Sequence, residues 1–162
     1  MSPTILLALI AGLPLVLTVA LRVKPLYIFV SIVCGYFASE FLGEVASLML
    51  GSIIHIGNIG IITRLVLLLL PLAITLFLMR KSLSAAALPF QFFLLVADSL
   101  LLATFLVPLL TLGMQNAIYS TNAGNIFRQA HDVLITSIAG LHVLVMWVMR
   151  PKHDAHGKHK KH

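Results

Sequence analysis

Long apolar runs without charges constrain this chain more than any other feature. Runs of about 18 residues, the length that crosses a hydrocarbon core of roughly 30 Å, recur along it. Of its 162 residues, 60% are hydrophobic and 10% are charged, whereas soluble domains average about 45–50% and about 25%. Too few charges remain to cover a soluble surface. The sequence therefore predicts an all-α, polytopic integral membrane protein.

We predict five membrane-spanning helices in a single transmembrane domain that covers residues 1–150. The spans are expected over residues 4–21, 25–50, 60–79, 90–112 and 133–149. The only sizeable polar connection is residues 113–131, and Asp132 is the expected N-cap of the last span. Residues 151–162 form a basic, flexible tail that is rich in Lys and His.

The basic residues predict the orientation of the chain. With five spans, two of the 11 Lys and Arg residues, Arg64 and Arg128, fall on one side of the membrane. The other nine share the opposite side: Arg22, Lys24, Arg80, Lys81, Arg150, Lys152, Lys158, Lys160 and Lys161. The positive-inside rule then places the N-terminus outside and the tail in the cytoplasm, beside anionic lipid head groups. Without aromatic platforms, this charge does not indicate a nucleic-acid partner.

A ladder of small residues marks the second span. Every fourth residue there is Ser or Gly, namely Ser31, Gly35, Ser39, Gly43, Ser47 and Gly51. Residues four apart stack into one ridge of a helix, so this ridge forms a groove with little side-chain bulk. Such grooves let membrane helices approach closely. We predict that a helix packs here, from a second copy or from a larger partner complex.

Two carboxylates lie beside the ladder, within an apolar segment. Glu40 and Glu44 are four residues apart and face one direction. Arg64 is the candidate partner, because antiparallel second and third spans place it near the level of Glu44. Two interpretations stay open. The acids line a proton or cation pathway, or a structural Glu–Arg pair joins two helices.

Asp98 and His142 are predicted near the centres of the fourth and fifth spans. Because these spans run antiparallel, the two side chains are expected at a similar depth, where they can meet. One interpretation is a proton relay in which His142 gains and loses the proton. The other is a static, hydrogen-bonded pair.

No cofactor or metal site is predicted. The single cysteine, Cys34, excludes an internal disulfide, and no Cys/His spacing typical of a metal site is present. We expect Cys34 to be a small packing residue. Two alternatives are a haem between His55 and His131, both near the outer surface, and loose binding of a transition metal by the tail histidines His153, His156, His159 and His162. No nucleophile constellation is readable, so we predict no catalytic residues and no enzyme.

The order of a short first span, a basic turn and a second span built on a small-residue ladder resembles the colicin V production protein (CvpA) family. The residues concerned are 21–51, LRVKPLYIFVSIVCGYFASEFLGEVASLMLG, and the resemblance extends over roughly residues 4–112. The family's Arg-Gly run is Arg22-Val23-Lys24 here, and a fifth span is added. The resemblance implies a non-enzymatic bacterial inner-membrane protein linked to toxin export or envelope maintenance.

Two functions follow as expectations. The first is a small scaffold or secretion-related subunit in the cell membrane, which packs through the Ser/Gly ladder as a homo-oligomer or in a larger complex. The second is a proton- or cation-conducting subunit that uses the intramembrane acids. They make different demands on the same helix, because assembly needs the ladder and conduction needs the carboxylates.

Overall fold

The computed structural model describes residues 3–52, 58–83 and 88–148. His55, Arg150 and the predicted basic tail lie outside the described residues. The described part is all-α and contains no strand. It comprises α1 (Pro3–Leu21), α2 (Pro25–Gly51), α3 (Ile59–Leu78), α4 (Leu88–Leu106), η1 (Val107–Leu109), α5 (Leu112–Tyr119), α6 (Asn122–Gln129) and α7 (His131–Val148).

Within the described residues, four helical segments are long and apolar enough to cross a membrane: Pro25–Gly51, Ile59–Leu78, Gln91–Leu109 and His131–Val148. The apolar part of α1, Ile5–Leu21, is shorter. Large apolar side chains are exposed along α2, α3 and α7, as expected where the neighbour is lipid rather than water. These features confirm an all-α, multi-pass membrane protein.

The predicted fourth span needs correction at its end. Residues 90–112 were expected to form one helix, but α4 ends at Leu106 and a 3₁₀ turn, η1, follows. Pro108 lies within that turn. Proline has no N–H to donate and its ring clashes with the preceding turn, so it ends the α-helical hydrogen-bond pattern.

The polar connection before the last span is folded into two short helices, α5 and α6. The Thr121 hydroxyl caps α6 by accepting a hydrogen bond from the Gly124 N–H at 3.0 Å. Asp132 is not the N-cap of α7, because that helix begins one residue earlier, at His131. In the first turn its carboxylate still faces the positive end of the helix dipole.

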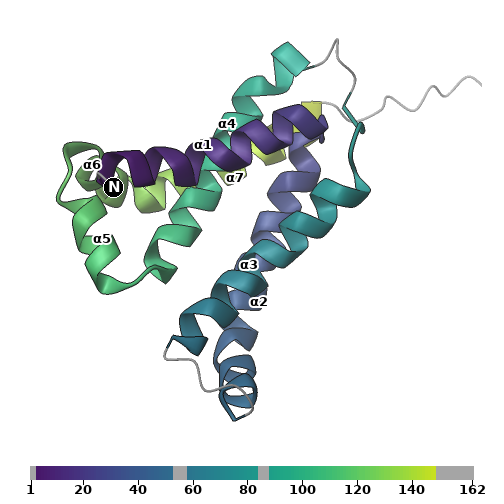
Figure 1. Cartoon of the computed structure of the whole chain (residues 1–162). Coiled ribbons are helices and arrows are strands. Elements are labelled where there is room, and N and C mark those ends of the chain that lie inside the picture. The colour runs from purple at the N-terminus through teal and green to yellow at the C-terminus, as the bar shows by residue number, and fades with distance from the viewer. Residues whose placement is uncertain (1–2, 53–57, 84–87, 149–162) are drawn as a thin grey trace, which may run out of the picture.

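Helix α4 lies at the centre of the molecule. It passes between α1 and α7, and α2 packs on it as well (Figure 1). Most of its side chains between Leu94 and Phe105 are buried. The ring of Tyr36 on α2 stacks on that of Phe105, with centroids 4.2 Å apart. Together with Leu68 and Leu72 of α3, residues of these helices form one core, in which α4 supplies the largest part.

The Ser/Gly ladder is filled by α3 of the same chain. Ser31, Gly35, Ser39 and Gly43 are buried in α2. A Cβ added to Gly35 would lie only 2.2 Å from the backbone oxygen of Leu68 on α3, so the two backbones are in direct contact. Ser47 and Gly51, further along the ladder, are half-buried.

Cys34 is exposed, so its prediction as a packing residue is wrong.

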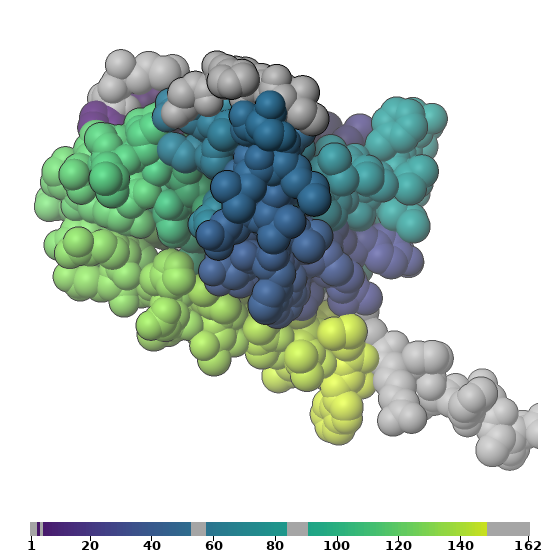
Figure 2. Space-filling view, turned by 90° about the horizontal axis from the view of Figure 1, so that it is seen from below, coloured from purple at the N-terminus to yellow at the C-terminus, as the bar shows by residue number. Residues whose placement is uncertain are grey.

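Beyond the core, α2 and α3 continue as a hairpin that stands away from the other helices (Figure 1). Seen from below, its end projects in front of the rest of the molecule (Figure 2). The second half of α2 exposes the large side chains of Phe41, Leu48 and Met49. This half of the hairpin has α3 as its neighbour on one side and an uncovered apolar surface on the others.

We expect Gly35→Ala to destabilise the protein, because the added methyl group must separate two backbones. Overpacking of this kind costs about 1–3 kcal/mol. Gly43→Ala should cost less, since its Cβ would meet the Arg64 side chain, which can move. Gly140→Ala is the matched control, because no described neighbouring atom lies within 4 Å of its added Cβ. Thermal unfolding in detergent measures all three, and equal effects at Gly35 and Gly140 would contradict the close approach.

Candidate functional site

Asp98 and His142 meet in the centre of the bundle. Asp98 lies on α4 and His142 on α7, and the Oδ1 and Nε2 atoms are 3.1 Å apart. Their side chains are 1% and 2% exposed, so both groups are removed from solvent. Ionisable side chains within membrane helices are rare, and they mark proton or ion pathways by default. The two predicted mid-membrane residues are thus in direct contact.

Two neighbours fix the His142 imidazole. Its Nδ1 lies 3.0 Å from the carbonyl oxygen of Ile138, one turn earlier on α7. On its face, the ring of Phe29 from α2 stacks at 4.2 Å between centroids, with an interplanar angle of 11°. These two contacts fix the orientation of the imidazole ring, because Phe29 packs on its face and the Ile138 carbonyl contacts its Nδ1 edge. Its Nε2 points to α4.

The Ile138 contact determines where a proton can reside. A carbonyl oxygen only accepts hydrogen bonds, so Nδ1 carries a hydrogen and donates it. A neutral imidazole then has its lone pair on Nε2, facing the Asp98 carboxyl group. One further proton lies either on Asp98 or on Nε2, and in both cases the pair is neutral overall. A neutral pair is the form that a low-dielectric interior favours.

The Asp98–His142 pair has few hydrogen-bond partners among the described residues. Asp98 Oδ1 and His142 Nε2 lie 3.1 Å apart, within the range in which a shared proton can form a hydrogen bond. Apart from this contact, the two Asp98 oxygens and the His142 Nε2 have no hydrogen-bond partner among the described residues. Buried polar atoms without a partner cost free energy and call for an explanation.

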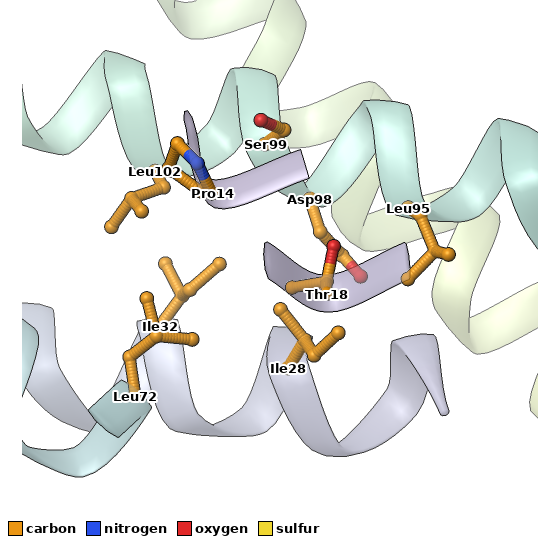
Figure 3. Close-up of a pocket in the computed structure, with 9 residues that line it drawn as sticks. All are labelled: Pro14, Thr18, Ile28, Ile32, Leu72, Leu95, Asp98, Ser99 and Leu102. Carbon is orange, nitrogen blue, oxygen red and sulfur yellow. The ribbon is translucent and has the colours of Figure 1, made fainter. Parts of the chain in front are cut away.

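Helix α1 covers the other side of Asp98. Thr18 of α1 lies beside the Asp98 carboxyl group, with Ile28 and Leu95 around it (Figure 3). The hydroxyl groups of Thr18 and Ser99 are engaged elsewhere: Thr18 donates to the Leu15 carbonyl at 2.9 Å, and Ser99 donates to the Ala11 carbonyl. The Ser99 bond supports the α1 backbone just before Pro14, where proline weakens the helix. Neither hydroxyl donates to Asp98.

A small cavity adjoins the carboxyl group. Its free volume is about 10 Å³, and Thr18, Asp98 and Ser99 supply its polar lining (Figure 3). A volume of this size accommodates about one water molecule, provided that polar partners are present. These three residues supply the polar partners, whereas the remaining lining residues are apolar.

Glu40, Glu44 and Arg64 do not form the predicted pair. Neither carboxylate lies within 4.0 Å of the guanidinium group, although all three side chains are described. Arg64 lies over Gly43 on the α3 side of α2. Glu40 and Glu44 lie on the ridge of α2 beside the Ser/Gly ladder. They are exposed on the part of the α2–α3 hairpin that stands away from the core. The geometry separates them from the Asp98–His142 pair.

Several residues of the site could not be identified from sequence. Phe29, Thr18 and Ser99 are ordinary residues of membrane helices, and no spacing distinguishes them. Asp98 and His142 could be identified from the sequence, because an ionisable side chain within an apolar run indicates a candidate site. Among the described residues, no group of three His, Cys, Asp or Glu side chains could hold a metal ion.

Comparison of the chain with protein-family models, with curated proteins and with solved structures gives no match. The resemblance to the colicin V production family therefore stays a prediction.

Proposed function

We propose that this chain is a proton-transferring membrane subunit in which Asp98 and His142 carry the proton. The observation that carries the proposal is the 3.1 Å contact between two buried ionisable groups on different helices. Apart from this contact, the Asp98 oxygens and the His142 Nε2 have no polar partner among the described residues. Intramembrane Asp and His residues commonly form such relays. Imidazole suits the role because it changes protonation near neutral pH.

The proposed cycle starts from the neutral pair that holds one proton between Oδ1 and Nε2. A second proton arrives at Asp98 from a water molecule in the adjoining cavity, and the pair becomes a carboxylic acid beside an imidazolium. Release of one of these protons to water restores the neutral pair, in which Nδ1 keeps the hydrogen that it donates to the Ile138 carbonyl. The intermediate bears one positive charge, and its cost in the membrane interior limits the rate.

Proteoliposomes loaded with a pH-sensitive dye test this function. We expect the wild-type protein to carry protons faster than empty liposomes, and Asp98→Asn and His142→Gln to fall to the level of empty liposomes. Asp98→Asn keeps the size of the side chain but removes its titration. Glu40→Gln/Glu44→Gln is the matched control and should retain the flux, since these acids lie outside the pair.

Flux that is lost in Glu40→Gln/Glu44→Gln but kept in Asp98→Asn would move the pathway to the α2 acids. No flux in the wild type, together with a strong loss of stability in Asp98→Asn, would make the pair a static structural element. Breaking one partner of a buried pair costs about 3–5 kcal/mol.

A scaffold or secretion-related subunit is the second candidate. One observation favours it: Glu40 and Glu44 are exposed on a helix face that also exposes Phe37 and Phe41. A carboxylate facing lipid is costly, so contact with another protein chain would relieve it. Because α3 fills the ladder, we place the assembly surface on this acidic face rather than in the groove.

A second copy is the partner we propose for that face, because each copy brings two acids and the guanidinium of Arg64 on the same hairpin. Light scattering in detergent should show a particle larger than a monomer, and Glu40→Gln/Glu44→Gln should reduce it to a monomer. A wild-type monomer, or a variant that assembles equally well, would contradict this surface.

We further propose five crossings of the cell membrane, with the N-terminus outside. The apolar length of α1 is at the short end of the range for a span. The exposed Arg22, Lys24, Arg80 and Lys81 gather at one end of the helices, where α7 also ends, which supports a cytoplasmic position for that end. Reporter fusions should place the two termini on opposite sides, whereas four crossings would place them on the same side.

A further inference from the structure

Two loops at one end of the molecule present four cations together. The α1–α2 loop contributes Arg22 and Lys24, and the α3–α4 loop contributes Arg80 and Lys81. All four side chains are exposed. We call this group the basic loop pair. The proton-transfer pathway does not use it.

Backbone hydrogen bonds hold the two loops against each other. The Lys81 N–H donates to the Leu21 carbonyl and the Leu83 N–H to the Arg22 carbonyl, both at 2.7 Å. The Lys24 N–H donates to the Ser82 hydroxyl at 3.0 Å. Beneath them, the side chains of Val23 and Leu83 are 0% and 3% exposed. The cations therefore belong to a fixed structure rather than to two independent loops.

Two of the four cations have a left-handed backbone conformation, which glycine adopts at a lower cost in free energy. Arg22 has φ 51° and Lys81 has φ 63°. In this left-handed region an L-residue with a long side chain is disfavoured relative to glycine or asparagine. Each loop nevertheless carries a cation there. The charge at these positions thus requires an explanation beyond the geometry of the turn.

Among the described residues, no carboxylate lies within 4.0 Å of a cation of the basic loop pair. The ion pairs among the described residues are His131–Asp132 and His142–Asp98. Four like charges held close together repel one another, so an external anion would stabilise this end of the protein. Head-group phosphates are the anions present at the end of a membrane-spanning helix.

An apolar groove starts next to the same loops. It has a volume of about 570 Å³ and lies between α2 and α3, with Met146 of α7 at its edge. Leu26 and Met79 line it nearest the loops, and Cys34 and Leu70 line its far end. Eight or nine helical residues separate these ends, which corresponds to about 12 Å. The groove therefore extends well into one leaflet of a bilayer.

We propose that the basic loop pair and this groove together bind one anionic phospholipid. The phosphodiester group contacts the cations of the two loops, and one acyl chain lies in the groove between α2 and α3. Cations alone would accept any phosphate, and the groove alone would accept any acyl chain. Because the cations and the groove adjoin, they favour a molecule that carries both a phosphate and an acyl chain. The lack of a described carboxylate within 4.0 Å of these cations favours a head group with a net negative charge.

Native mass spectrometry of the full chain, titrated with phosphatidylglycerol or phosphatidylcholine, tests the proposal. We expect the wild type to bind phosphatidylglycerol more tightly. Arg22→Gly/Lys81→Gly should weaken that binding roughly 30-fold, about fivefold for each charge removed. Glycine relaxes both left-handed positions, so this variant should be at least as stable as the wild type in detergent. Weaker binding then cannot result from misfolding.

Two further variants separate the parts of the site. Arg128→Gln removes an exposed cation on α6 and should leave lipid binding unchanged. Ile74→Trp fills the groove without altering charge and should weaken the binding of phosphatidylglycerol. Should Arg22→Gly/Lys81→Gly prove less stable than the wild type, Lys24→Gln/Arg80→Gln decides, because it leaves both left-handed positions intact.

Equal affinity for the two lipids would overturn the proposal, as would an equal loss in Arg128→Gln. Inorganic phosphate is the arm that distinguishes a free anion from a lipid. If phosphate binds the wild type as tightly as phosphatidylglycerol does, or if Ile74→Trp has no effect, the site recognises a free anion and the lipid proposal fails.

Discussion

The burial of Asp98 against His142 is the interaction on which the bundle depends. Removing a carboxyl group and an imidazole from water is tolerated only where they pair closely, and the 3.1 Å contact meets this condition. It fixes α4 relative to α7, while Phe29 brings α2 onto the imidazole and Thr18 brings α1 beside the carboxyl group. The most buried helix of the fold is therefore the one that carries the acid.

A membrane interior also explains how the other helices pack. Between lipid-like side chains there is little hydrophobic drive, so close backbone contact takes its place. The contact of Gly35 with the Leu68 backbone is an example. The ladder serines serve mainly through their small size: Ser31 donates its hydroxyl to the Ile28 carbonyl on its own helix, at 2.8 Å. Among the charged groups outside the core, Glu40 and Glu44 on the hairpin and the basic loop pair are available for contacts beyond the chain.

Much of this arrangement could be predicted from the sequence, because a membrane allows few solutions. The bounds of α2 and α3 follow from apolar length and from Pro25, and the meeting of Asp98 with His142 follows from antiparallel spans of similar depth. The failures concern which face of a helix meets which neighbour. The ladder was expected to bind another chain but holds α3, and Arg64 lies over Gly43 instead of reaching Glu44. Periodicity defines a face without identifying its neighbour. The end of α4 before Pro108 was not predicted, because the hydropathy of a segment does not show that proline lacks an N–H donor.

The central claim is that the buried pair gains and loses protons rather than only joining two helices. Infrared difference spectroscopy, with the pH changed between about 5 and about 8, tests it most directly through the carbonyl stretch of a protonated carboxyl group. The account predicts a pH-dependent carboxyl band in the wild type that is absent in Asp98→Asn and altered in His142→Gln. A spectrum in which no such band changes with pH, or in which the band persists in Asp98→Asn, would contradict it.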